Sequence, residues 1–176
     1  MLLPSFPYHP DPTATGAVRS GSEVCVCCEM ARGYIYVGPV YSIQDLDDSF
    51  CPWCIADGTA ANRFSASFSD DWSFINVGLP ASVVEEVEYR TPGYKCWQSA
   101  NWPQHCNDIC AFYGDATVQD LETPAIECRV EEFDDLTSSH GQWSRILEHY
   151  TPGGDPSLYK FVCRHCQAAL FTWDCS

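Results

Sequence analysis

The stretch Cys51-Pro52-Trp53-Cys54 places two thiols two residues apart, and a similar pair, Cys25 and Cys28, lies upstream. Two Cys-x-x-Cys pairs at such a separation are typical of a four-thiolate zinc site. Zinc takes its ligands at tetrahedral corners, which puts the sulfur atoms about 3.7 Å apart for Zn–S bonds of ~2.3 Å. The sequence therefore predicts a structural zinc site formed by Cys25, Cys28, Cys51 and Cys54, because the protein would fill all four corners.

A further Cys-x-x-Cys pair, Cys163 and Cys166, predicts a second zinc site. Its most plausible partners are Cys106 and Cys110, a looser pair with three intervening residues. Two histidines are alternatives as ligands, because His105 precedes Cys106 and His165 lies inside the last pair. The remaining cysteines are expected to be unligated: Cys27, Cys96, Cys128 and Cys175.

The pattern of apolar residues predicts an α+β protein, in which zinc staples short antiparallel strands and a few short helices. The last cysteine pair lies between two β-prone segments, which is typical of a zinc-ribbon hairpin. A Ser-rich segment before Gly78 suggests two lobes, a zinc-knuckle lobe over 1–78 and a second zinc lobe over 79–176. The expected strands are 33–37, 158–162 and 169–173, and the expected helices are 55–64, 80–89 and 141–150.

The charge of the chain narrows the range of partners. Its formal net charge is −15, with only nine Lys and Arg residues. Such a field repels nucleic acid and anionic lipid, so the sequence favours a basic protein partner. No apolar run has the ~18–20 residues of a membrane span.

Twelve cysteines without an export signal indicate a reducing cytoplasm, where thiols remain available to metals. A disulfide-rich secreted domain is the alternative explanation of this cysteine content.

The sequence contains no Gly-x-Ser-x-Gly, P-loop or His-Glu-x-x-His motif, and it favours a non-catalytic role. One alternative is a thiol-disulfide oxidoreductase that uses Cys51 and Cys54, since a helix N-terminus after the pair would lower a thiol pKa. The acidic, polar segment 44–49 argues against it, because a thioredoxin-like site follows a buried strand. A zinc-dependent hydrolase with an open metal position is the other alternative.

Several blocks of the chain resemble the bacterial CbrC family. The most specific runs from Cys51 to Gly58, and others cover 8–12, 32–36, 89–93, 102–114 and 161–166. The resemblance implies a cytoplasmic, zinc-binding group without an established activity, named for a link to colicin tolerance under envelope-stress regulation. It also places the motif cysteines on the eight predicted zinc ligands. Cys96 departs from the family pattern, and Gln167 stands where a zinc ribbon usually has glycine.

The expected function is therefore that of a non-catalytic zinc-binding interaction or adaptor module, linked to stress or colicin tolerance.

Overall fold

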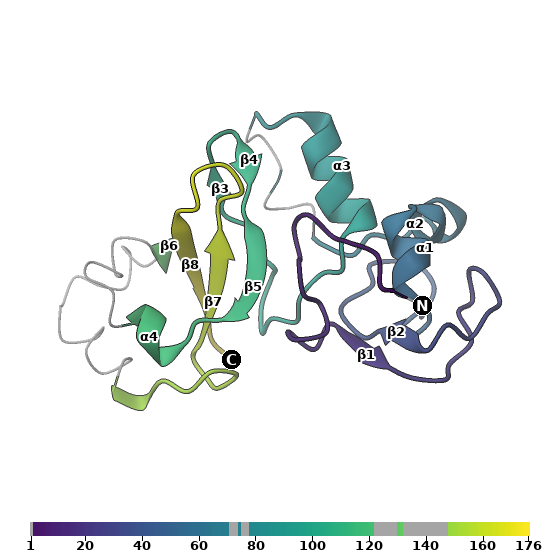
Figure 1. Ribbon diagram of the computed structural model, residues 1–176, viewed down its shortest axis with the longest axis horizontal. Helices are drawn as coiled ribbons and strands as arrows, with labels where there is room; N and C mark the ends of the chain where they lie inside the picture. Colours follow the sequence, from purple (N-terminus) through teal and green to yellow (C-terminus); the bar gives the residue numbers. More distant parts are fainter. Residues whose placement is uncertain (1, 71–73, 75–77, 122–129, 132–147) are drawn as a thin grey trace. The chain divides into compact units, whose positions relative to one another are not determined.

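A computed structural model describes residues 2–70, 74, 78–121, 130–131 and 148–176 (Figure 1). The chain divides into two compact units, Met1–Lys95 and Cys96–Ser176. The lobe boundary expected after residue 78 differs from this division, because the following helix is fastened to the first unit. The backbone N–H of Phe68 donates to the carbonyl of Glu88 at 2.8 Å, which places that helix beside the preceding chain.

The described residues of the first unit form a small sheet and three α-helices. Strands β1 (Val18–Ser20) and β2 (Tyr34–Tyr36) pair antiparallel, and the connection between them carries Cys25 and Cys28. Helix α1 (Pro52–Ala56) begins inside the Cys51–Cys54 pair, with Pro52 at its first position, where a missing N–H costs nothing. Strand β2 confirms the strand expected at 33–37.

Helix α2 (Thr59–Phe64) follows α1 directly, so the single helix expected over 55–64 is two helices. Gly58 separates them because it adopts the left-handed conformation, with φ of 77°. This conformation suits glycine and interrupts the hydrogen-bonded ladder of a helix.

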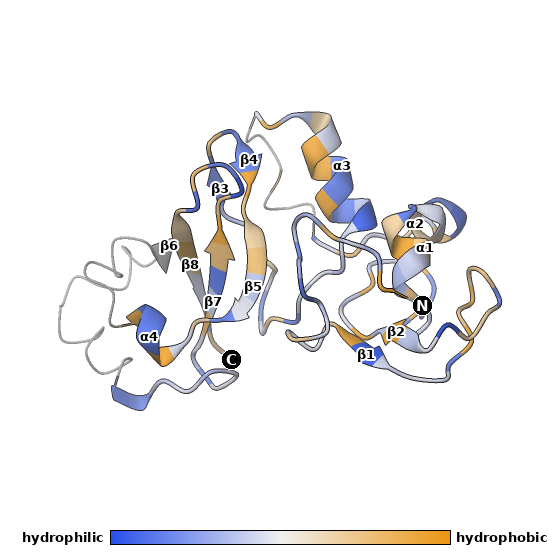
Figure 2. Ribbon diagram, in the orientation of Figure 1, coloured by the Kyte–Doolittle hydropathy of each residue, from blue (hydrophilic) through white to orange (hydrophobic). Residues whose placement is uncertain are grey.

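Helix α3 (Ala81–Arg90) confirms the helix expected near 80–89. Pro80 precedes it, and hydrophobic and hydrophilic stretches alternate along it (Figure 2). Val87 on its inner face is fully buried. The hydroxyl of Thr91 donates to the carbonyl of Glu86 at 2.8 Å and satisfies one of the groups exposed at the helix end.

Aromatic rings and cysteines together form the core of the first unit. Phe68 makes edge contacts with Tyr36 and Phe50, at centroid distances of 5.5 and 5.9 Å. The same cluster of buried residues includes Cys25, Cys27, Cys51 and Cys54. The thiols of the first unit are therefore part of its core.

The second unit is built on a four-stranded sheet with the order β5-β7-β8-β6. Its long central strands, β7 (Ser157–Val162) and β8 (Ala169–Asp174), pair antiparallel and confirm the hairpin expected around the last cysteine pair. Strand β5 (Ala111–Asp115) pairs antiparallel with β7, and β6 (Val130–Glu131) pairs parallel with β8. Trp102 packs on Phe112 and Phe161.

The remaining elements of the second unit are short. Strands β3 (Gln104–His105) and β4 (Asp108–Ile109) form a separate antiparallel hairpin, and helix α4 covers Val118–Leu121. The helix expected at 141–150 lies largely outside the described residues. Mixed short helices and small sheets, with cysteine groups that could hold zinc, confirm the α+β class. Among the described helices, none has the length and apolar character that crossing a membrane requires.

Candidate metal centres

The structure brings together one ligand atom each from Cys25, Cys28, Cys51 and Cys54, all within 4.8 Å of one another. We call these residues the first cluster. The Sγ atoms of Cys28 and Cys51 are 3.8 Å apart, close to the edge of a tetrahedral zinc thiolate site, about 3.7 Å. The backbone N–H of Cys51 also donates to Cys25 Sγ at 3.2 Å, so the site supplies a donor for a negatively charged sulfur.

Three thiols of the first cluster have pKa values that are shifted in different directions. The hydrogen bond between the two thiols, with help from the backbone N–H of Cys51, lowers the pKa of Cys25 to about 4, whereas the same thiol contact and burial raise the pKa of Cys51. Burial raises the pKa of Cys54 to about 12. Because several buried thiolates repel one another, all four thiols can ionise together only with a compensating cation.

Cys27 lies in the same turn but is not one of the four grouped residues. It is buried, as expected for an unligated thiol between two ligands that face the cluster. Its backbone carbonyl accepts a hydrogen bond from the Arg63 guanidinium, which ties the turn to α2.

A second group consists of His105, Cys106, Cys163 and Cys166, whose ligand atoms also lie within 4.8 Å of one another. We call these residues the second cluster. The Nδ1 atom of His105 is 3.2 Å from the Sγ atoms of both Cys106 and Cys166. This nitrogen is therefore the imidazole atom that faces the sulfur atoms of the cluster.

The β3–β4 hairpin explains why His105 and Cys106 act as a pair. His105 pairs with Asp108, so only Cys106 and Asn107 form the turn. Both turn residues have positive φ angles, 55° and 58°, which is the pattern of a type I′ turn. The tight reversal projects the residues at the end of the hairpin toward the same cluster.

The predicted ligand Cys110 does not join the second cluster. It lies beyond the hairpin, fully buried, and its N–H donates to the carbonyl of Pro103 at 2.9 Å. His105, considered from sequence as a replacement for Cys106, instead accompanies Cys106 in the position expected for Cys110. His165, the other alternative, has its Nε2 atom 2.8 Å from the Asp108 carboxylate.

The two knuckles, Cys25–Cys28 and Cys163–Cys166, share one backbone conformation. In each, the N–H of the residue after the second cysteine donates to the carbonyl of the first, from Glu29 at 2.8 Å and from Gln167 at 3.0 Å. Glu29 and Gln167 are both left-handed, with φ of 57° and 61°. Two distant segments thus adopt the same turn, which supports a shared role for their cysteines.

Two thiols of the second cluster, those of Cys163 and Cys106, also have shifted pKa values. Although burial opposes the shift, the backbone N–H groups of Cys166 and His165 lower the pKa of Cys163 to about 6. The neighbouring Cys166 raises the pKa of Cys106 to about 11. The donor set, three thiols and one imidazole, therefore fits a divalent cation, as does the four-thiol set of the first cluster. Both cysteine-rich groups could bind a metal ion.

Comparison with known proteins identifies relatives along nearly the whole chain. UPF0167 protein PA1536 of Pseudomonas aeruginosa is 45% identical over 173 residues, which cover 98% of this chain and 97% of the relative. UPF0167 protein Mb2317 of Mycobacterium bovis and UPF0167 protein MT2352 of Mycobacterium tuberculosis are each 48% identical over 171 residues, which cover 96% of this chain and 91% of each relative. No solved structure matches the chain.

The model of an uncharacterised protein family, UPF0167, matches residues 3–175, and this span includes every residue of both clusters. With this match and relatives above 40% identity, the chain belongs to the UPF0167 family.

Proposed function

We propose that this protein is a non-catalytic, zinc-binding interaction module in which both clusters hold structural zinc. The observation that carries the proposal is that each cluster supplies four ligand atoms from the protein itself. Structural zinc is almost always four-coordinate, whereas catalytic zinc has three protein ligands and an open position. Thiolate and imidazole donors suit zinc, and in cells whose cytoplasm is reducing these thiols would remain available to it.

The alternative of a thiol-disulfide oxidoreductase is less well supported. A redox-active thiol must be accessible to its substrate, but Cys51 is fully buried and Cys54 nearly so. Two more thiols, Cys25 and Cys28, also lie within reach of this pair. A zinc-dependent hydrolase fits the more exposed second cluster better than the first, and it would require one of the four ligands there to leave the metal.

Metal analysis tests the proposal directly. Protein purified without added metal should contain two equivalents of zinc, one for each cluster. Cys28→Ser should remove one equivalent, whereas Cys27→Ser, a change at the adjacent unligated position, should retain both. Metal-free wild-type protein that keeps its fold, or two equivalents of iron in place of zinc, would contradict the proposal.

The exposed residues around the first knuckle best suit a partner that is a basic protein segment with apolar side chains. Three apolar residues of the first knuckle and its flanks are exposed, Val24 at 60%, Val26 at 39% and Met30 at 47%. The N–H of Val26 donates to the carbonyl of Ser49 at 3.0 Å, so the exposed Asp48 lies close to these apolar residues. The chain as a whole carries a net charge of −15. We extend this proposal to the role suggested by the resemblance to the CbrC family, in stress or colicin tolerance.

Matched variants test the interaction surface. Val24→Lys should abolish salt-sensitive capture of basic proteins, because it puts a positive charge where apolar contact with a basic segment is expected. Val118→Lys in the second unit is the control, since Val118 is exposed to nearly the same degree, at 58%. The surface is not the docking site if both variants capture the same proteins as the wild type.

A further inference from the structure

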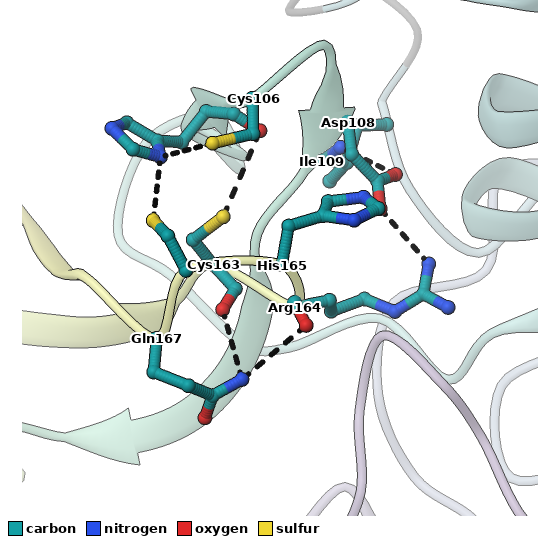
Figure 3. Close-up of polar contacts among 9 residues, drawn as sticks. Cys106, Asp108, Ile109, Cys163, Arg164, His165 and Gln167 are labelled. Atoms are coloured by element: carbon teal, nitrogen blue, oxygen red, sulfur yellow. Dashed lines mark hydrogen bonds and ion pairs between the residues drawn. The ribbon is translucent and has the colours of Figure 1, made fainter.

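The carboxylate of Asp108 contacts the second knuckle at two points. Asp108 is only 4% exposed, and its Oδ1 atom accepts a hydrogen bond from the N–H of Ile109 at 2.9 Å. Its Oδ2 atom lies 3.1 Å from the Arg164 guanidinium and 2.8 Å from His165 Nε2. Figure 3 shows both side chains converging on this carboxylate, away from the sulfur of Cys163.

These contacts connect the two segments that supply the ligands. Asp108 belongs to the β3–β4 hairpin, which carries His105 and Cys106. Arg164 and His165 are the two residues between Cys163 and Cys166. The carboxylate therefore joins hairpin and knuckle without occupying a ligand position. Charge-assisted hydrogen bonds at a buried carboxylate are among the stronger polar contacts in proteins.

The Cys25–Cys28 knuckle of the first cluster has no charged residues that could form an equivalent contact. The corresponding positions between Cys25 and Cys28 are Val26 and Cys27, which carry no formal charge. Its ligands are held instead by their place in a core of aromatic rings. The second cluster has two exposed ligands, Cys106 and Cys166, and packing constrains these less.

We propose that Asp108 is a positioning residue of the second cluster, which holds the knuckle against the hairpin and so preorganises the four ligands for metal. This inference rests on the proposed function, namely that the second cluster binds zinc. Groups that orient metal ligands typically change metal affinity 10–100-fold when they are removed. Asp108 would act here through the backbone of the knuckle, because its contacts reach the two residues between the ligands.

The test compares zinc affinities of full-length variants by chelator competition. Asp108→Asn should weaken zinc binding at the second cluster about 10–100-fold and leave the first cluster unchanged. Asp120→Asn is the matched control, because Asp120 forms an ion pair with Lys160 at 2.6 Å in the same unit, and neither residue belongs to the cluster. This control should bind both equivalents with wild-type affinity.

Two readouts separate positioning from general destabilisation. The cobalt-substituted Asp108→Asn variant should keep the absorption bands of a tetrahedral three-thiolate, one-imidazole site while its affinity falls. In a background with Arg164→Gln and His165→Gln, Asp108→Asn should have almost no further effect on affinity. An equal loss in both backgrounds, or wild-type affinity in Asp108→Asn, would overturn the inference.

The wild type also distinguishes this inference from the proposed function. Wild-type protein that binds two equivalents, combined with an unaffected Asp108→Asn variant, would overturn the role of Asp108 alone. Wild-type protein that binds a single equivalent, with His105→Ala unchanged in metal content, would overturn zinc binding at the second cluster and the role of Asp108 with it.

Discussion

The two clusters use the same knuckle in different surroundings. In the first cluster three of the four ligands are buried, and the cysteines are part of the aromatic core. In the second cluster Cys106 and Cys166 are exposed, and the ligands lie at the ends of two hairpins. If both clusters bind metal, these surroundings predict that the stability of the first unit depends on its ion more than that of the second.

The two units also differ in how many apolar side chains, apart from the cysteines, their strands and helices bring into the core. The first unit has two three-residue strands and short helices, so its core closes around the thiols. The second unit has two six-residue strands whose side chains pack together, with Trp102 against Phe161 and a separate cluster around Leu158 and Phe171. A metal ion bound at the first cluster would thus be central to its core, whereas one bound at the second cluster would be peripheral.

The largest effect is expected for Cys54→Ser. Loss of this ligand should unfold the first unit, because structural zinc contributes about 10 kcal/mol or more in small zinc domains. Circular dichroism and hydrogen exchange should show protection lost in the first unit and retained in the second. Wild-type melting of this variant would mean that the buried cluster is not structural.

A smaller effect is expected for His105→Ala. The variant should lose the second equivalent of zinc, yet its four-stranded sheet should stay protected from hydrogen exchange because Trp102, Phe112 and Phe161 pack without the metal. Cys110→Ala serves as the comparison and should retain both equivalents, since Cys110 lies outside the cluster. Unfolding of the sheet in His105→Ala would show that the two units depend equally on metal.

Acid should affect the first unit through His9 as well as through its thiols. His9 Nδ1 donates to the carbonyl of Pro92 at 2.7 Å, and Nε2 lies 2.6 Å from the hydroxyl oxygen of Thr15. Burial lowers the pKa of His9 from 6.5 to about 4. As the pH falls from 6.5 to 4 the unfolded chain binds a proton that the folded chain does not, which removes roughly 3 kcal/mol of stability.

The variant His9→Gln isolates this contribution from protonation of the thiols. It should be less stable than the wild type at pH 7, and the gap in unfolding free energy should narrow as the pH approaches 4. Urea denaturation at several pH values measures the gap. A gap that stays constant over this range would exclude His9 as a source of pH dependence.

The smallest effect is expected for the left-handed residues of the knuckles. Gln167→Gly should relieve the strain of a φ of 61° but lose the contacts from the Gln167 amide to the carbonyls of Cys163 and Arg164. The net gain should not exceed about 1 kcal/mol. Thermal denaturation of Gln167→Gly and Glu29→Gly measures both positions, and a large loss at either would show that the side chain matters more than the backbone.

The first cluster could be predicted from the sequence because the two cysteines of each pair are close together in the chain. Each Cys-x-x-Cys pair forms one turn, and only the meeting of two pairs had to be inferred. The hairpin strands of the second unit were also evident, since β-prone residues flank the last pair. Zinc as the metal, and ligation by the individual residues, stay predictions.

The second cluster depends on a turn that could not be recognised from the sequence. Type I′ turns usually contain Asn-Gly or Asp-Gly, whereas this turn consists of Cys106 and Asn107. Spacing alone suggested that Cys110 joins the site, but the reversed chain carries it into the interior. Asp108 could not be recognised either, because its partner Arg164 lies far along the chain and only the fold brings them together.

The order of the ligands in the chain has a consequence for biosynthesis. The first cluster is complete once Cys54 has been synthesised, but the second needs Cys166, over a hundred residues later. At ribosomal rates of about 5–20 residues per second, this interval lasts roughly 5–20 s. During this interval the nascent chain could bind an ion at its first cluster, and in the later part of it the thiol of Cys106 is already present, accessible to competing metals and oxidants until Cys166 follows.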